Sequence, residues 1–140
     1  MARARSWRAL AALGGVLVPE SYRAVEAECA DLPTRAALLP APWEALVSIG
    51  GADWRSFLHN LLTQDITGLR PGLVRPAALA DRKGHLQADL WVGAMSEERG
   101  LLRVRRDLLP VVLPLFEKHH FRERVEWSVL DPDMAHLLLL

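Results

Sequence analysis

The sequence contains a single cysteine, Cys29, among its 140 residues. One cysteine excludes an intrachain disulfide and any metal site made of cysteines alone within this chain. Basic and acidic residues are equally numerous, 17 of each, so the formal net charge is +0. Since nucleic-acid-binding domains usually carry a basic excess, this balance argues against a general polyanion-binding protein. The local cluster Arg103-Arg105-Arg106 leaves a basic patch open as an alternative.

Long apolar runs are also absent, and no stretch is long enough to span a bilayer, so we expect no membrane partner. The amino terminus superficially resembles a signal peptide, with basic residues before the apolar stretch 10–18. That stretch is short, is interrupted by Gly14-Gly15, and is followed by Pro19-Glu20 in place of a small-residue cleavage site. Together with the single cysteine, this favours a cytoplasmic protein.

Several motifs of known chemistry are missing. No glycine-rich phosphate loop and no Ser-His-Asp order occurs, so hydrolase and nucleotide-binding functions have no support. His119, His120 and His136 lack the spacing typical of a metal site, and we predict none. The sequence therefore provides no catalytic residue on these grounds.

Hydrophobic residues make up 51% of the chain and charged residues 24%, which predicts a packed globular protein. A stripe at helical spacing predicts a helix that begins at Asp53, with the Asp53 side chain as its cap. The stripe consists of Trp54, Phe57, Leu58, Leu61 and Leu62. We expect two further helices, one over 21–30 capped by Ser21 and one over 108–119 with a late start or a kink at its prolines.

Alternating or β-rich segments predict strands at 43–49, 74–80, 86–92, 101–105 and 125–129. Strands 74–80 and 86–92 are expected to pair through a turn at 81–84, with Gly84 in the left-handed conformation. The stretch 33–42 contains three prolines and is expected to be irregular. The leucines at 137–140 are typical of a strand whose covering layer lies outside the chain, which predicts an incomplete domain.

The element order β-α-β-β-β-α-β predicts an α+β fold close to the ferredoxin-like split βαβ sheet, with helices on one face. We expect a leading segment with a short helix at 1–42 and one domain at 43–140. In strand 86–92 the even-numbered residues share one face, while Gln87, Asp89 and Trp91 share the other. Asp89 is therefore expected beside an aromatic ring and an amide, away from the main apolar stripe.

Three segments together resemble a known family. They are the run Gly51 to Ile66, which contains Thr63-Gln64-Asp65, then Pro71-Gly72, and then Asp81 to Leu90. This combination resembles the amino-terminal half of the YgfZ/GcvT folate-binding family, which includes the aminomethyltransferase of the glycine cleavage system. Within that family, Lys83-Gly84-His85 resembles the YgfZ-like branch more than the aminomethyltransferases.

The resemblance implies the amino-terminal part of the aminomethyltransferase folate-binding fold and a tetrahydrofolate cofactor. It also implies a role in assembling or maintaining iron–sulfur enzymes, with effects on tRNA modification. The expected partners are folate, iron–sulfur client enzymes and a chain or domain that completes the fold. The implied folate-binding residues are Asp89 as the polar anchor, Gln87, Trp91, Asn60, Gln64 and Lys83. These positions also have simpler interpretations. Asp89 would be a strand carboxylate bonded to backbone, Gln64 would lie at a helix end satisfied by local hydrogen bonds, and Lys83 would be solvated at a hairpin tip.

Two departures from the family pattern leave other functions open. The aminomethyltransferases carry an acidic pair where this chain has Ala88-Asp89. The Lys-Gly-Cys-Tyr-x-Gly-Gln-Glu signature of YgfZ-like proteins is absent from the chain, and Cys29 lies in a different segment. The alternatives are an aminomethyltransferase that moves a one-carbon unit to tetrahydrofolate and a non-catalytic, truncated interaction module.

Overall fold

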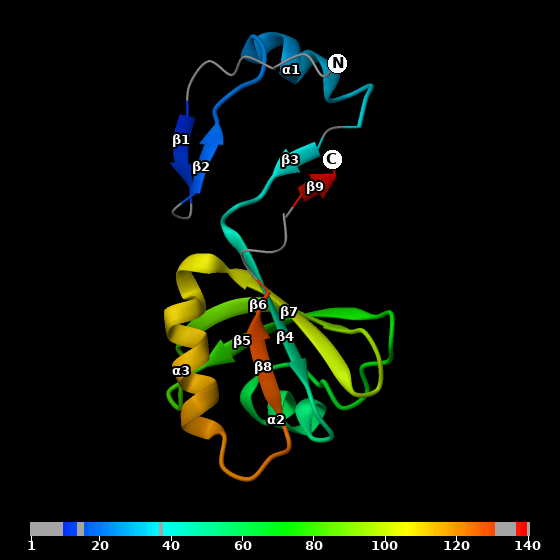
Figure 1. Cartoon of the computed structure of the whole chain (residues 1–140), viewed down its shortest axis with the longest axis vertical. Coiled ribbons are helices and arrows are strands. Elements are labelled where there is room, and N and C mark those ends of the chain that lie inside the picture. The colour runs from blue at the N-terminus through cyan, green and yellow to red at the C-terminus, as the bar shows by residue number, and fades with distance from the viewer. Residues whose placement is uncertain (1–9, 14–15, 37, 131–136, 140) are drawn as a thin grey trace. The chain divides into compact units, whose positions relative to one another are not determined.

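The structure, a computed structural model, describes residues 10–13, 16–36, 38–130 and 137–139 (Figure 1). The chain divides into two compact units. Residues 1–43 and 135–140 form the amino-terminal unit, and residues 44–134 form the sheet unit.

The described part of the amino-terminal unit contains two short strand pairs and one helix. β1 (Leu10–Leu13) pairs with β2 (Val16–Pro19), and β3 (Leu38–Pro40) pairs with β9 (Leu137–Leu139), both antiparallel. The helix α1 (Val25–Asp31) has no buried residue. The apolar run near the carboxyl end is thus a strand, as predicted, and two of its three leucine side chains are exposed.

Two local predictions for this unit are wrong. The helix begins at Val25 and is not capped by Ser21. Instead, the Glu28 carboxylate accepts hydrogen bonds from two backbone N–H groups before the helix, at 2.9 and 2.8 Å, and so holds those residues in a non-helical turn. The stretch 33–42 is not wholly irregular, because it contributes β3. That strand depends on a partner about a hundred residues later, which a local pattern cannot reveal.

The sheet unit contains a five-stranded antiparallel sheet with the order β5-β6-β7-β4-β8. The strands are β4 (Glu44–Gly50), β5 (Val74–Ala80), β6 (Leu86–Ala94), β7 (Arg99–Arg105) and β8 (Glu126–Val129). Each lies within two residues of a predicted strand at both ends, and β5, β6 and β7 form a meander. The predicted α+β class is confirmed.

Two helices connect these strands. α2 (Trp54–Leu61) leads from β4 to β5, and α3 (Leu109–His119) leads from β7 to β8 after the 3₁₀ turn Arg106–Leu108. Strands β7 and β8 both pair antiparallel with β4, which lies between them, so β7-α3-β8 is a split βαβ unit. The meander has three strands, one more than a ferredoxin-like sheet has between its helices, and β4 and β5 therefore run antiparallel.

Both helices cover the same face of the sheet (Figure 1). The stripe on α2 is confirmed, because Trp54, Phe57 and Leu58 are all buried. The ring of Phe57 stacks on Trp127 of β8 with centroids 5.7 Å apart and meets Phe116 of α3 edge-on at 5.7 Å. Such offset and edge-to-face contacts add about 0.5–1.5 kcal/mol each to the burial of the rings. This aromatic cluster joins α2, α3 and β8 into one core.

The start of α2 is as predicted, but the role of Asp53 is not. Its side chain makes no capping bond to the helix. The carboxylate accepts hydrogen bonds from the backbone N–H of Arg124 at 2.8 Å and from its guanidinium Nε at 3.2 Å. Asp53 therefore ties the beginning of α2 to the segment that enters β8, a connection across 71 residues.

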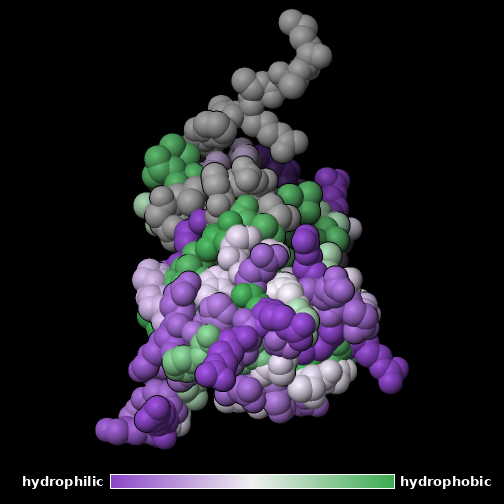
Figure 2. Space-filling view, turned by 60° about the horizontal axis from the view of Figure 1, so that its bottom comes forward, coloured by the Kyte–Doolittle hydropathy of each residue, from purple (hydrophilic) through white to green (hydrophobic). Residues whose placement is uncertain are grey.

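Figure 2 shows the end of the sheet unit at which α2 lies, and the surface there is mainly hydrophilic, with small separate apolar areas. Among the described residues, no helix is both long and apolar enough to cross a lipid bilayer.

Gly100 on β7 lies against the buried ring of Trp54. A Cβ atom at this position would lie 2.7 Å from Cζ3 of that ring. Because Trp54 is 1% exposed and held in the core, Gly100→Ala should destabilise the protein by about 1–3 kcal/mol, as overpacking does. Urea unfolding measures the change. Gly68→Ala is the control, because its new methyl group would make an ordinary contact at 3.5 Å with the Asp65 carboxylate. Equal urea midpoints for the two variants would contradict the packing argument.

The Asp53–Arg124 pair makes stability depend on pH. The hydrogen bonds from the Arg124 guanidinium, and next from its backbone N–H, lower the pKa of Asp53. Folding therefore favours the charged carboxylate, and this contribution is complete above the ordinary aspartate pKa and disappears as the pH falls through the lowered pKa. Asp53→Asn should be less stable than the wild type at pH 7, and the difference should shrink below about pH 4.

Urea midpoints at pH 7, 5 and 3 provide the measurement. Glu98→Gln is the matched control, because the Glu98 side chain has no bonding partner in the described part of the chain. A deficit of Asp53→Asn that stays constant down to pH 3 would show that the carboxylate charge is irrelevant.

Candidate functional site

The sheet has a second face that neither helix covers, and we call it the open face. Successive residues of a strand point to opposite sides, so the strand residues outside the core lie here. Cross-strand register aligns Pro76, Trp91, Arg103 and Leu46 in one row across four strands. The next row contains Val74, Gly93, Leu101 and Ser48. Trp91 is 42% exposed, which is unusual for so large an apolar ring.

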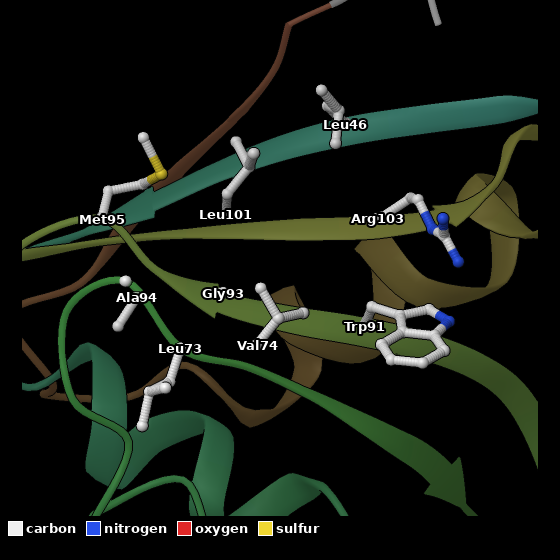
Figure 3. A pocket seen from close by; sticks show the side chains of 10 residues that line it. Leu46, Leu73, Val74, Trp91, Gly93, Ala94, Met95, Leu101 and Arg103 are labelled. Atoms are coloured by element: carbon white, nitrogen blue, oxygen red, sulfur yellow. The ribbon is translucent and has the colours of Figure 1, made fainter. Parts of the chain in front are cut away.

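A hollow of about 420 Å³ lies on the open face. Figure 3 shows Trp91 and Arg103 side by side at one end of it and Met95 at the other. Gly93 lines the hollow without a side chain, and a Cβ atom at this position would lie 3.4 Å from Cγ2 of Val74. The lining residues are Leu46, Gly72, Leu73, Val74, Trp91, Gly93, Ala94, Met95, Leu101 and Arg103. The hollow is thus apolar, with one charged group at its end.

That charged group is the guanidinium of Arg103. Its Cζ atom lies 5.2 Å from the centroid of the Trp91 ring, within the range of a cation–π contact. Its Nε atom lies 3.8 Å from a carboxylate oxygen of Glu44, a side chain that is 17% exposed. This distance permits ionic attraction but is too long for a hydrogen bond. The stacking on Trp91 therefore orients a cation that keeps hydrogen-bonding capacity.

Asp89 lies on the same face, two residues before Trp91 on β6, and its side chain is exposed. It is outside the hollow's lining. The pKa of Arg105 is raised, first by its hydrogen bond to Asp107 and to a smaller extent by the charges of Asp89 and Glu44. The open face therefore carries a mixed charge network beside the apolar hollow.

The turn between β5 and β6 has the predicted form, with Gly84 at φ +82°. The Asp81 carboxylate accepts backbone N–H bonds from His85 at 2.9 Å and Lys83 at 2.8 Å, and these bonds, His85 first, lower its pKa. Lys83 is exposed at the tip of this hairpin. Gln87 is half-buried and donates to the carbonyl of His85 at 3.4 Å, so its amide is directed toward the turn.

The other two predicted residues come from a different part of the unit. Asn60 is exposed on α2, on the helical side of the sheet. Gln64 follows Thr63, whose backbone N–H donates to the Ala78 carbonyl at 2.9 Å and whose hydroxyl accepts from the Ala78 N–H at 3.1 Å. These bonds attach the end of α2 to β5, which is an edge strand of the sheet.

The structure thus brings three of the six predicted residues, Gln87, Asp89 and Trp91, to one face of one strand. Among the six, Trp91 lines the hollow. Sequence reasoning missed Arg103, which it treated as part of a basic cluster. Alternation on 101–105 could have placed Arg103 on the same side as Leu101, but its position opposite Trp91 follows from the β6–β7 register, which the sequence does not show.

The rim of the hollow is held by Arg55 of α2. Its guanidinium donates to the carbonyls of Leu69 and Ser96, both at 3.2 Å, and also to the carbonyl of Glu97. The indole N–H of Trp54 donates to the same Glu97 carbonyl at 3.0 Å. One side chain thus fixes both the β6–β7 turn and the segment that leads to Leu73. Among the described residues, no group of three or more His, Cys, Asp or Glu side chains could hold a metal ion.

No protein-family model matches the sequence. Over 86 residues the chain is 30% identical to an uncharacterised protein of Haemophilus influenzae, an alignment that covers 61% of this chain and 31% of that protein. Over 106 residues it is 27% identical to an aminomethyltransferase of Bacillus subtilis, covering 76% of this chain and 29% of the enzyme. The chain therefore spans less than a third of the length of these curated relatives.

A crystal structure has the same fold. It is that of the glycine cleavage system aminomethyltransferase T from Bartonella henselae, which superposes with a TM-score of 0.76 at 22% identity. The superposition covers 88% of this chain and 34% of the enzyme. This chain is thus similar in sequence to aminomethyltransferases and has the fold of part of one.

Proposed function

We propose that this chain is a tetrahydrofolate-binding protein of the YgfZ-like kind, with the open face of the sheet as its binding surface. The observation that carries the proposal is the placement of Asp89 and Trp91 on that face, two residues apart on β6 and beside an apolar hollow. The similarity to aminomethyltransferases supports the same ligand, since the family resemblance implies folate use.

The chemistry of the ligand matches these two side chains. Tetrahydrofolate has a pterin ring with an edge of N–H donors, an aromatic linker and an anionic glutamate. An ionised carboxylate is an acceptor only, so Asp89 is suited to the pterin N–H groups. The exposed face of Trp91 is suited to stacking on a flat ring. Gln87 would add an amide on the same strand. Asn60, Gln64 and Lys83 remain proposed contacts, but they lie outside the open face, so the ligand would have to reach them from other sides of the sheet.

The finer part of the proposal is a role in the assembly or maintenance of iron–sulfur proteins, with an effect on tRNA modification. It is supported by Lys83-Gly84-His85, which resembles the YgfZ-like branch. Iron–sulfur client enzymes and a polypeptide that completes the fold would be the partners. Loss of iron–sulfur enzyme activity after deletion of the gene would support this role, and undiminished activity would contradict it.

Aminomethyl transfer to tetrahydrofolate is the second candidate, because the named relatives are aminomethyltransferases. The missing acid at position 88 bears less on this choice than the sequence suggests. Ala88 is 2% exposed and lies on the helix-covered face, so an acid there would point away from the open face. Turnover of a lipoyl-bound aminomethyl substrate by the purified chain would favour the transferase, and folate binding without turnover would favour the first proposal.

The primary test is the thermal melt of the purified chain with excess 5-formyltetrahydrofolate. A ligand at a hundred times its Kd adds about 2.7 kcal/mol, which raises the Tm by several degrees in a protein of this size. Asp89→Asn should weaken binding by about tenfold or more, since it removes a charge-assisted hydrogen bond, and should leave the melt of the free protein unchanged.

Glu98→Gln is the matched control, because it removes an exposed carboxylate from the β6–β7 turn and should bind as the wild type does. Equal folate affinity in Asp89→Asn and the wild type would remove Asp89 from the site. No shift in the wild type itself would reject folate as the ligand of this chain.

A further inference from the structure

The two edges of the five-stranded sheet differ in their protection. At one edge, β5 contains Pro76, which has no N–H group, and the backbone of its Ala78 is already bonded to Thr63. At the other edge lies β8, which has neither proline nor lysine, and no strand among the described residues pairs with its outer side. Proteins usually protect an edge strand, because its exposed backbone groups can pair with another strand. The β8 edge is therefore the unprotected one.

The hydrogen-bond pattern shows which backbone groups β8 presents at this edge. The N–H of Leu130 donates to the Leu46 carbonyl at 2.9 Å, so these residues form a hydrogen-bonded pair of the β4–β8 ladder. Such pairs alternate along an antiparallel ladder, so Ser128 also bonds to β4, while the residues on either side of it do not. The N–H and C=O groups of Trp127 and Val129 therefore point away from β4, at the outer edge.

The helix beside this edge is more apolar than its burial requires. All residues from 109 to 116 in α3 are apolar, and of the residues of this helix Val112 and Phe116 are buried, while both prolines are exposed. A helix that is apolar on all sides is usually covered on all sides. The ring of Phe116 meets Trp127 of β8 edge-on with centroids 5.6 Å apart, so α3 packs against the edge strand. The unpaired edge and the apolar helix thus form one continuous surface.

We propose that β8 pairs antiparallel with β8 of a second copy of this chain, about a two-fold axis at Ser128. In this register Trp127 of each copy lies opposite Val129 of the other, and each such pair exchanges two backbone hydrogen bonds. Their side chains form an aromatic–β-branched pair on the helix-covered face, which is a favourable cross-strand combination. Glu126 lies opposite Leu130, so no like charges face each other. The two five-stranded sheets then form one continuous sheet.

Two features favour a second copy over an unrelated partner. The pairing is self-complementary, and the dimer is closed, because the edges that remain are the two protected β5 strands. A stable interface usually buries about 800 Å² on each partner. A strand edge of four residues cannot bury so much, and the apolar outer surface of α3 would supply the remainder. None of the residues proposed to bind folate lies on β8 or α3, so the interface does not depend on the proposed function.

Sedimentation velocity of the purified chain, without folate and over a range of protein concentrations, tests the interface. The wild type should form a dimer that dissociates on dilution. Ser128→Lys should be monomeric at every concentration, because like charges would face each other across the axis, and Ser128→Glu should be monomeric for the same reason. An equimolar mixture of the two variants should form a dimer, because opposite charges then meet at the axis.

Ser48→Lys is the matched control. Ser48 lies opposite Ser128 in the β4–β8 ladder and on the same face, but one strand away from the edge. This variant should therefore form the dimer as the wild type does. The Ser128 side chain is exposed, so the variants should melt with the wild type at a concentration at which all of them are monomeric.

A disulfide provides an independent measurement of the register. Opposite residues of a non-hydrogen-bonded antiparallel pair have Cα atoms about 4.5 Å apart, which is within the range that a disulfide spans. Ser128→Cys should therefore give a covalent dimer with oxidised glutathione, in a background in which Cys29→Ser removes the exposed natural cysteine. Glu126→Cys in the same background should give far less, because the two copies of this residue lie on opposite sides of the axis.

Several outcomes would overturn the proposal. A wild type that is monomeric at every concentration would reject the dimer. A Ser128→Lys dimer as stable as that of the wild type would reject β8 as its interface in this register. Failure of Ser128→Lys and Ser128→Glu to associate when mixed, or a stronger crosslink from Glu126→Cys than from Ser128→Cys, would show that the two Ser128 residues do not face each other.

Discussion

The two-residue alternation of β6 is the constraint on which the candidate site depends. Ala88, Leu90 and Val92 are buried under α2 and α3, and each is at most 2% exposed. Because their burial fixes one face of the strand, Asp89 and Trp91 are fixed on the other. A shift of one residue in register would move three apolar side chains to the surface and two polar or aromatic ones into the core. The energy that maintains the fold therefore also orients the proposed ligand contacts.

The same coupling extends to the edges of the hollow. Arg55 and Trp54 are adjacent on α2, and the guanidinium of one stacks at 4.7 Å on the ring of the other. From this position both donate to the carbonyl of Glu97, and so the β6–β7 turn beside Met95 is attached to the helical layer. A hydrogen bond from a charged donor to a carbonyl stabilises a protein more than a hydrogen bond between two neutral groups does. The open face is thus exposed to solvent but backed by a rigid layer, which favours a preformed binding surface.

Much of the sheet unit could be predicted from sequence because its signals are local. The helical stripe of α2, the alternation in β6 and the glycine turn at 81–84 each require only neighbouring residues to be interpreted. The errors involve partners far away in the chain. Asp53 is a residue type that commonly caps helices. Here its carboxylate instead accepts two hydrogen bonds from Arg124, 71 residues later, and makes none to the helix. Strand β3 exists because β9 pairs with it. Arg103 became a candidate through the register of β6 and β7.

The buried position of Ala88 changes how the acidic pair of the aminomethyltransferases is to be interpreted in this fold. Adjacent residues on a strand point to opposite faces, so a pair at 88 and 89 cannot present two carboxylates to one ligand on the open face. A carboxylate in place of Ala88 would lie in the core, where burial without a partner disfavours the charged form. The difference at this position therefore concerns the helix-covered face of the sheet and not the open face. In the proposed site, the carboxylate on the open face is that of Asp89, and a transferase that needed a second carboxylate there would have to take it from another element.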